Sequence, residues 1–256
     1  MIFNKEAGRN QRLVASSYAG VSRRQAILEA LSIESDHKII DIGCGAGHLV
    51  EDLAKALGDQ GRVYALDPGE EQLEEARVRC SSFSNVIFLN GYADNIALED
   101  DSCDIATSTQ AYEYVKDVDK ALIESSRVLK PGGAFVNVSI LWDYFRFHGA
   151  EEKLNNLIHD AFRAHCYHQM LPLELEGKLK ALGFQYITNK SLAFLITRRD
   201  QNSPARHLET MVASFAVSQG ISTSKVEEWR GQLADAEACG RFGFTSYPVL
   251  TSAYLK

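Results

Sequence analysis

Short apolar runs alternate with amphipathic segments over the first 140 residues of the chain. Runs rich in β-branched and other apolar residues predict strands over 39–42, 62–67, 86–89, 105–107 and 134–140. Apolar residues at helical spacing predict helices over 21–31, 48–57, 69–80 and 119–129, with Ser22 as the N-cap of the first helix and Gly58 as the C-cap of the second. Short apolar strands that alternate with helices are typical of a parallel sheet covered on both faces. We therefore expect an α/β fold.

The pattern changes after residue 140. Helical spacing returns over 151–165 and 173–182, where Gly183 ends the second helix, and a strand is predicted at 184–187. Two further helices are predicted within 204–239, followed by a last strand over about 244–255. Trp142, Tyr144, Phe145 and Phe147 follow the fifth strand, where they fit either the pocket of a flat ligand or a hydrophobic core.

The segment 39–50 is the most informative part of the chain, because a buried strand leads through three glycines, Gly43, Gly45 and Gly47, into a helix. Residues without a Cβ allow positive φ and a close approach of the backbone to a small molecule. The free N–H groups of a helix start face whatever lies there. A dinucleotide fingerprint requires its third glycine at position 48, where the chain has His48. The turn therefore predicts a ligand site of another kind.

Carboxylates flank this turn. Asp41 precedes the first glycine, and Asp67 ends the next strand. A carboxylate at the end of that strand can accept hydrogen bonds from both ribose hydroxyls of an adenosine, because it has two acceptor oxygens.

Five motifs in order make the chain resemble the class I S-adenosylmethionine-dependent methyltransferases, in particular the small-molecule branch with the ubiquinone and menaquinone biosynthesis enzymes. The resemblance covers roughly residues 35–140 and is loose on either side. The motifs are residues 41–47 (Asp-Ile-Gly-Cys-Gly-Ala-Gly), 66–68 (Leu-Asp-Pro), 90–98 (Asn-Gly-Tyr-Ala-Asp-Asn-Ile-Ala-Leu), 101–106 (Asp-Ser-Cys-Asp-Ile-Ala) and 127–133 (Arg-Val-Leu-Lys-Pro-Gly-Gly).

The resemblance implies a Rossmann-like, doubly wound, mostly parallel seven-stranded sheet with an antiparallel last strand and a helical cap insertion. It also implies S-adenosyl-L-methionine as cofactor and S-adenosyl-L-homocysteine as product. We expect a single domain over 1–256, with 35–140 as the cofactor-binding core and 141–183 and 204–239 as additions on the substrate side. No linker rich in Pro, Gly or Ser interrupts the chain.

The cofactor contacts implied by the resemblance come from the ends of the first four strands and from the leading segment, where Tyr18 would be a lid contact or ordinary surface. They are Asp41, Gly43, Cys44, Gly45, Gly47, Asp67, Pro68, Ala93, Asp94, Gln110 and Tyr18. The chain departs from the family at Tyr92, where the acidic residue after Gly91 is expected. Asp94 would then take the adenine amine, or Tyr92 would line the pocket.

Methyl transfer is an in-line displacement, and positioning in a closed site can supply most of the acceleration. A general base is needed only if the acceptor must lose a proton. The candidate bases are His148, His168 and Tyr112, with His165 and Glu113 as further candidates. A histidine in an amphipathic helix is more often structural, and the histidine that relatives carry at position 114 is absent, since the chain has Tyr114.

Composition narrows the kinds of partner, metal site and cellular environment that we expect for this protein. A net charge of −7 argues against nucleic acid or an anionic membrane surface as partner. The chain has no apolar stretch of about 18 residues, and its five scattered cysteines suit reduced thiols rather than disulfides or a zinc site. An arsenic methyltransferase, from another branch of the resembled family, would need several cooperating thiols, which the scattered cysteines do not indicate. We expect a cytoplasmic monomer or homodimer without a metal.

These observations favour a methyltransferase that acts on an O, C or N atom of a small hydrophobic or aromatic metabolite. Two other functions stay open. A protein could keep the cofactor pocket but act as a cyclase or a binding module, and an NAD-dependent oxidoreductase would share the sheet type but not the glycine spacing.

Overall fold

The computed structural model describes residues 13–200 and 203–256. Its contacts divide the chain into two compact units. The large-sheet unit comprises residues 22–139, 170–191 and 249–256, and the small-sheet unit comprises the described parts of the rest. The single domain expected over 1–256 stays a prediction.

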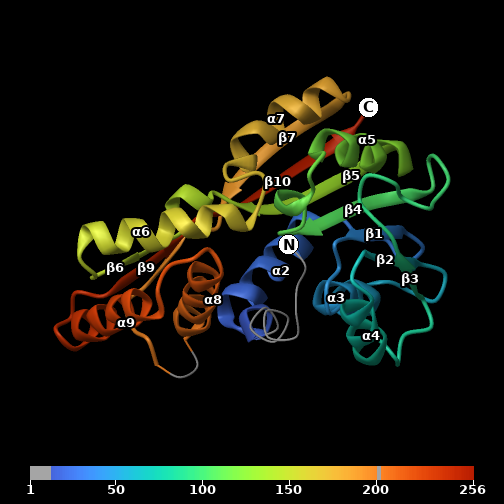
Figure 1. Cartoon of the computed structure of the whole chain (residues 1–256). Coiled ribbons are helices and arrows are strands. Elements are labelled where there is room, and N and C mark those ends of the chain that lie inside the picture. The colour runs from blue at the N-terminus through green and yellow to red at the C-terminus, as the bar shows by residue number, and fades with distance from the viewer. Residues whose placement is uncertain (1–12, 201–202) are drawn as a thin grey trace. The chain divides into compact units, whose positions relative to one another are not determined.

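The large-sheet unit is built on seven strands in the order β3-β2-β1-β4-β5-β10-β7 (Figure 1). The strands are β1 (Lys38–Ile42), β2 (Arg62–Asp67), β3 (Val86–Asn90), β4 (Cys103–Thr109), β5 (Leu129–Ile140), β7 (Phe184–Ser191) and β10 (Pro248–Leu255). Strands β1 to β5 pair in parallel, whereas β10 and β7 pair antiparallel. This arrangement confirms the predicted fold class. The strand order reverses between β1 and β4, and such a switch point is where open α/β sheets bind ligands.

Helices cover both faces of this sheet. Figure 1 shows α5 (Val118–Val128) and α7 (Leu171–Ala181) on one face and α3 (His48–Ala56) and α4 (Glu70–Arg79) on the other. Leu171, Leu175 and Leu179 of α7 repeat every four residues and are fully buried in the main core. Burying each side chain contributes about 1.5–3 kcal/mol. Residues 170–183 therefore pack with the sheet, while the expected division into a cofactor-binding core and substrate-side additions stays a prediction.

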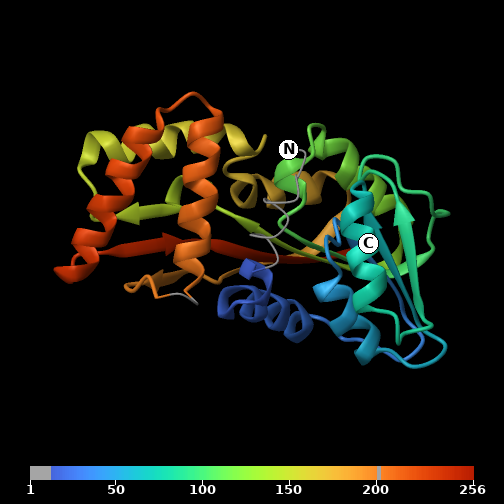
Figure 2. The same ribbon diagram turned by 60° about the horizontal axis from the view of Figure 1, so that its bottom comes forward.

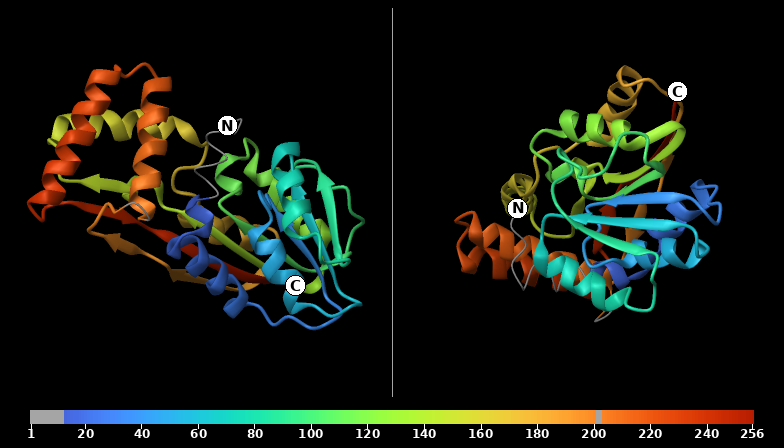
Figure 3. Two further views of the ribbon diagram at one scale, coloured as in Figure 1. Left: turned by 90° about the horizontal axis from the view of Figure 1, so that it is seen from below. Right: turned by 90° about the vertical axis from the view of Figure 1, so that its right-hand side faces the viewer.

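The small-sheet unit contains β6 (Arg146–His148), β9 (Gly243–Ser246) and β8 (Phe194–Ile196), paired antiparallel in the order β6-β9-β8. Figures 2 and 3 show α6 (Glu152–Phe162), α8 (Pro204–Ser218) and α9 (Thr223–Ala238) of this unit in yellow to red. The helix starts are capped where side chains allow it: Ser203 Oγ accepts from Ala205 N–H, and Glu151 Oε2 accepts from Leu154 N–H at 2.9 Å.

Aromatic side chains form the core of the small-sheet unit. Phe147 and Phe244 are fully buried with ring centroids 4.6 Å apart, and Trp229 meets Phe147 edge to face at 5.4 Å. Trp142 and Phe145 are also buried, at 7% and 3% exposure. Three of the four aromatics after the fifth strand are thus core residues, while Tyr144 is 53% exposed.

Several element boundaries differ from the prediction. Helix α2 (Tyr18–Ala30) begins before Ser22, which lies inside the helix and does not cap it. The predicted last strand over 244–255 is two strands, β9 and β10, because the chain leaves the small sheet at Tyr247 and joins the large one at Pro248. Strands β6 and β8 were not predicted, since three residues are too few to show a period.

Candidate cofactor site

The glycine turn after β1 is left-handed at all three glycines. Gly43, Gly45 and Gly47 have φ of 74°, 51° and 76°. A Cβ on Gly43 would lie 2.2 Å from Ala111 Cβ, and one on Gly47 would lie 2.8 Å from Ala76 Cβ. A Cβ on Gly45 would have its nearest neighbour, Gln72 Oε1, at 3.7 Å. Two glycines therefore allow close packing, while a Cβ on Gly45 would make only an ordinary contact with Gln72, which leaves room for a ligand near the backbone.

The Asp67 carboxylate holds this turn from the end of β2. Its Oδ2 accepts from Gly45 N–H at 2.9 Å, and its Oδ1 accepts from Gly69 N–H at 2.8 Å. Burial raises the pKa of Asp67, and the two backbone hydrogen bonds partly offset that effect. Each carboxylate oxygen has two lone pairs. Asp67 can therefore accept from ribose hydroxyls while it keeps the turn in place, so the predicted role fits its geometry.

Asp41 lies beneath the turn rather than in it. Its side chain is buried, and Oδ1 accepts from Thr107 Oγ1 at 3.0 Å on the neighbouring strand β4. Burial raises the pKa of Asp41 to about 7, the hydrogen bond from Thr107 lowers it, and the Asp67 carboxylate raises it. Asp41 therefore links the end of β1 to β4 through Oδ1, two residues before the first glycine of the turn.

The carboxyl ends of four neighbouring strands bring most predicted cofactor residues to one edge of the sheet. In the order of β3, β2, β1 and β4, the segments are 91–95, 67–69, 43–47 and 110–113. Gly91 N–H donates to Asp67 O at 3.3 Å, which ties the loop after β3 to Asp67. In this loop Ala93 and Asp94 are half-buried, whereas the Tyr92 side chain is 67% exposed. Pro68 is exposed and Cys44 is buried. The adenine contacts stay a prediction.

The loop after β4 carries a strained residue beside this edge. Gln110 has φ of 54°, and its N–H donates to Val138 O at 2.7 Å. Left-handed backbone at a residue other than glycine costs about 1–3 kcal/mol and is concentrated at functional sites. The Gln110 side chain accepts through Oε1 from Arg23 Nη1 of α2. Glu113, in the short helix η1 (Tyr112–Tyr114), is fully buried, and its charge raises the pKa of Arg23.

Arg23 was not among the predicted site residues. Its signal was its spacing, because it precedes Ala26 by three residues and Ile27 by four, and both are buried. A cation on the apolar face of an amphipathic helix is unusual. In the structure Arg23 is only 6% exposed.

The structure does not support Tyr112 as a catalytic base. Its side chain is fully buried, and its hydroxyl lies 2.6 Å from Ser125 Oγ of α5. Its ring lies 5.9 Å from that of Phe135, and burial raises the pKa of the phenol well above its ordinary value. Tyr112 is a core residue that joins β5 and α5.

The candidate histidines belong to the small-sheet unit. His148 Nε2 lies 3.2 Å from Thr245 Oγ1, and burial together with the charge of Arg146 lowers its pKa. His165 is buried and stacks on Phe162, with its Nδ1 2.7 Å from Phe162 O. His168 is half-buried, and the side chain of Tyr18 at the start of α2 is 83% exposed. Catalysis by His148 or His168 and a lid role for Tyr18 stay predictions.

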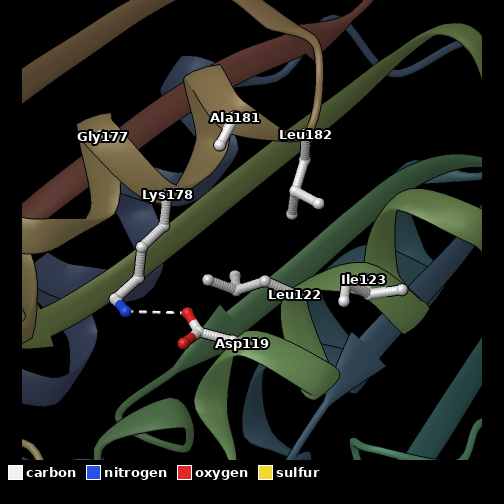
Figure 4. Close-up of a pocket in the computed structure, with 7 residues that line it drawn as sticks. All are labelled: Asp119, Leu122, Ile123, Gly177, Lys178, Ala181 and Leu182. Carbon is white, nitrogen blue, oxygen red and sulfur yellow. Dashed lines mark hydrogen bonds and ion pairs between the residues drawn. The ribbon is translucent and has the colours of Figure 1, made fainter.

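Outside this edge, a surface groove lies between α5 and α7 (Figure 4). It is lined by Asp119, Leu122, Ile123, Gly177, Lys178, Ala181 and Leu182. Lys178 Nζ and Asp119 Oδ1 form an ion pair at 2.7 Å between the two helices. Over residues 13–200 and 203–256, no group of three metal-ligating side chains occurs, and no helix is long and apolar enough to cross a membrane.

Comparison with known proteins agrees with this geometry. Residues 40–137 match the sequence profile of a methyltransferase domain. An uncharacterised transposon protein of Streptomyces fradiae is 35% identical over 130 residues, which cover 51% of this chain and 38% of that protein. Demethylmenaquinone methyltransferase of Staphylococcus epidermidis is 33% identical over 113 residues, 44% of this chain and 47% of the enzyme. The chain thus spans less than half the length of these curated relatives.

Solved structures share the fold at low sequence identity. Phosphoethanolamine N-methyltransferase 2 of Haemonchus contortus, in complex with S-adenosyl-L-methionine, aligns with a TM-score of 0.66 at 20% identity, over 98% of this chain and 57% of that one. The [4+2]-cyclase SpnF aligns with a TM-score of 0.58 at 18% identity, over 94% and 85%. The matched residues span β1 to β5 with the glycine turn and Asp67. Residues 40–137 are therefore a methyltransferase domain of the class I, S-adenosylmethionine-dependent type.

Proposed function

We propose that the chain transfers a methyl group from S-adenosyl-L-methionine to an O, C or N atom of a small, hydrophobic or aromatic metabolite. The observation that carries the proposal is the Asp67 carboxylate. It braces the left-handed glycine turn through Gly45 N–H at 2.9 Å and keeps lone pairs for a ribose. Those features stand at the switch point of the sheet, where a nucleoside would lie.

The residues at this edge divide the cofactor between them. Asp67 would accept from the ribose hydroxyls, and the open side of Gly45 would admit the amino-acid end to the backbone. Ala93 and Asp94 would flank the adenine from the loop after β3. Gln110 would contact the cofactor from the loop after β4. Asp41 would act indirectly, by holding the end of β1 to Thr107 of β4 just before the turn.

The bound cofactor supplies an activated methyl group on a sulfonium. It would offer this methyl group to an electron pair of the acceptor, with S-adenosyl-L-homocysteine as the neutral leaving group. The chain's part is to hold the acceptor in line and to exclude water. His148 and His168 are the proposed proton acceptors for substrates that must lose a proton. The buried Tyr112 is no longer proposed for that role.

The acceptor class rests on the relatives and on charge. Demethylmenaquinone methyltransferase and phosphoethanolamine N-methyltransferase are named for small-molecule acceptors. A net charge of −7 disfavours a polyanionic acceptor such as nucleic acid. We further propose a cytoplasmic protein that works as a monomer or homodimer.

Calorimetry with S-adenosyl-L-methionine and S-adenosyl-L-homocysteine tests the cofactor. We expect micromolar binding that Asp67→Ala weakens about tenfold or more, which corresponds to about 1.4 kcal/mol. Asp104→Ala is the matched control, because Asp104 lies at the opposite end of β4 in an ion pair with Lys130. Equal losses in both variants would remove Asp67 from the site.

The two other functions give different results in the same experiment. A cyclase or binding module would bind the cofactor but form no S-adenosyl-L-homocysteine with any acceptor, and the fold shared with SpnF keeps that alternative open. An oxidoreductase would bind NAD instead. Binding of NAD alone would overturn the proposed function.

A further inference from the structure

We propose that α7 forms the centre of a homodimer interface, in which two copies of this chain pack their α7 helices antiparallel across a two-fold axis near Gly177. The inference does not rest on the proposed function, because it uses the outward face of one helix and not the cofactor edge of the sheet. Of the two assemblies that the sequence leaves open, monomer and homodimer, it selects the homodimer and gives it an interface.

The first step is the outward face of α7, on which the exposed residues of the helix gather. Leu171, Leu175 and Leu179 are fully buried in the main core. Gly177 lies midway between Leu175 and Leu179, so in a helix of 3.6 residues per turn it lies on the side opposite to them. The other exposed residues of α7 surround Gly177 on this side, and they are Leu173, Glu174, Lys180 and Ala181.

The second step is the apolar surface of this face. The Leu173 side chain is 70% exposed. Gly177 and Ala181 follow on the same side at spacings of four residues, and no atom of the described residues lies within 4 Å of where a Cβ on Gly177 would be. Ile123 of α5, which is 51% exposed, borders the adjacent groove (Figure 4). A projecting leucine thus stands beside a low apolar surface that a second leucine can cover, and such exposed apolar patches mark interaction sites.

The third step is the order of charges along α7. Glu174 and Glu176 lie in its first half, and Lys178 and Lys180 lie in its second half. Within one copy they pair along the helix, with Lys178 Nζ 3.7 Å from Glu174 Oε2 and Lys180 Nζ 2.5 Å from Glu176 Oε1. In an antiparallel pair of α7 helices, the acidic half of each lies against the basic half of the other, whereas a parallel pair would bring like charges together. The charge order therefore favours the antiparallel arrangement.

The fourth step is that this face is complementary to itself. In a two-fold dimer the same surface of both copies meets, so every contact occurs twice. Leu173 precedes Gly177 by four residues and Ala181 follows it by four. An axis at Gly177 would therefore place Leu173 of each copy against Ala181 of the other. The absence of a side chain at Gly177 would let the two helix backbones approach closely. A second copy of this chain thus matches the surface in both apolar contacts and charge.

The expected interface is small, which sets the concentration range of the test. α7 has 11 residues, so it is about 16 Å long. Two such helices bury less than the roughly 1,000 Å² of a typical specific interface, so α5 must contribute through the residues beside the groove. We therefore expect a dissociation constant in the micromolar range.

Sedimentation velocity of the full chain from about 1 to 100 μM tests the proposal. We expect a monomer of 28.4 kDa that becomes a dimer as the concentration rises. Leu173→Asp places a charge in the apolar contact and should weaken the dimer about tenfold or more. Higher salt should also weaken it, because salt screens the charges that would pair between the helices.

Two charge variants test the arrangement of the helices. Glu174→Lys with Glu176→Lys makes α7 basic throughout, and Lys178→Gln with Lys180→Glu makes it acidic. Each double variant should lose self-association about tenfold or more, because like charges then meet. An equal mixture of the two should form a heterodimer, because opposite charges meet again. Circular dichroism checks that each variant is folded.

The matched control is Glu71→Lys with Glu74→Lys, which makes the same change of net charge at two exposed positions of α4. It should change the dissociation constant by less than about twofold. Gln replaces Lys178 in the acidic variant because a glutamate would lie beside Asp119, which is 2.7 Å from the lysine. If the charge variants do not fold, Leu173→Asp decides, since the Leu173 side chain is 70% exposed.

Three results would overturn the proposal. The chain could stay monomeric over the whole concentration range. It could form a dimer that Leu173→Asp and both charge variants leave intact, which would place the interface elsewhere. The two folded charge variants could also fail to associate with each other when mixed, which would exclude the antiparallel arrangement. Calorimetry with the cofactor is a separate measurement, so failure of the proposed function would leave these results unaffected.

Discussion

A hydrogen bond between Asp67 and Gly45 joins the end of β2 to the glycine turn after β1 in the candidate cofactor site. Asp67 Oδ2, at the end of β2, accepts from the N–H of Gly45, the central glycine of the turn after β1, at 2.9 Å. The same carboxylate holds Gly69 N–H with its other oxygen, at the start of α4. One side chain thus fixes two loops at the carboxyl edge of the sheet, so a change at Asp67 alters the shape of the site as well as its chemistry.

Gly43 and Gly45 of the turn should respond differently to alanine. Gly43→Ala places its Cβ 2.2 Å from Ala111 Cβ, so steric conflict adds to the strain of positive φ. Gly45→Ala meets nothing nearer than 3.7 Å and should cost only the strain of about 1–2 kcal/mol. We expect Gly43→Ala to lower the free energy of unfolding clearly more than Gly45→Ala, as measured by urea denaturation.

The control is Gly132→Ala, since Gly132 has φ of 82° and a Cβ there has nothing within 4 Å. It should match Gly45→Ala in stability. Binding should still separate the two, because an added methyl group at Gly45 occupies space proposed for the ligand. Equal stability losses for Gly43→Ala and Gly132→Ala would contradict the packing role of Gly43.

Asp41 should make stability fall as pH rises from about 4 to 7. Burial raises its pKa in the folded protein from 3.8 to about 7, so in that range the folded state holds a proton that the unfolded state has lost. Stability therefore decreases with pH, by at most about 4 kcal/mol for three pKa units. Asp41→Asn has no proton to lose and keeps an oxygen for Thr107. We expect the free energy of unfolding of Asp41→Asn, relative to that of the unchanged protein, to be higher at pH 7 than at pH 4.5. Urea denaturation at the two pH values measures this difference.

Asp104→Asn serves as the comparison of opposite sign. Hydrogen bonds from Lys130 and Lys38 outweigh burial and lower the pKa of Asp104, so its contribution is present above pH 3.8 and is lost only as pH falls further. Its effect on stability should be constant between pH 4.5 and 7. A flat difference for Asp41→Asn as well would show that Asp41 ionises normally in the folded protein.

Tyr112→Phe should affect stability and not catalysis. The hydroxyl bonds Ser125 Oγ at 2.6 Å in the core, and loss of such a bond costs about 1 kcal/mol. Ser125→Ala should cost a similar amount, and the double variant should cost less than the sum. Thermal unfolding measures the loss. A large fall in kcat for Tyr112→Phe, with stability unchanged, would restore Tyr112 as a candidate base.

The sequence predicted the large-sheet unit well because its elements carry local signals. The strands are short apolar runs, and three glycines at alternate positions indicate a turn whose backbone has positive φ. The bounds of β2, for example, agree with the predicted 62–67. Asp67 was identified because it is the acidic residue that ends the predicted strand 62–67.

The missed features depend on contacts between distant segments. No residue near Arg23 in the sequence indicates that its partner is Gln110, which lies 87 residues later. Nothing in the sequence around Tyr112 indicates that its hydroxyl is hydrogen-bonded to Ser125 of α5. The strands β6 and β8 are only three residues each and exist because β9 pairs with both of them.

The pairing of Ser191 with Val249 has a consequence for how the large sheet is completed. These residues are direct partners in the antiparallel ladder of β7 and β10, so the chain leaves the large sheet and returns to it at two adjacent points. Topologically, residues 192–247 are the connection of one long β-hairpin. The entropic cost of closing such a connection rises only slowly with its length, so the ladder of β7 and β10 can form across it. The large sheet therefore keeps its strand register although β8, α8, α9 and β9 all lie between two of its paired strands.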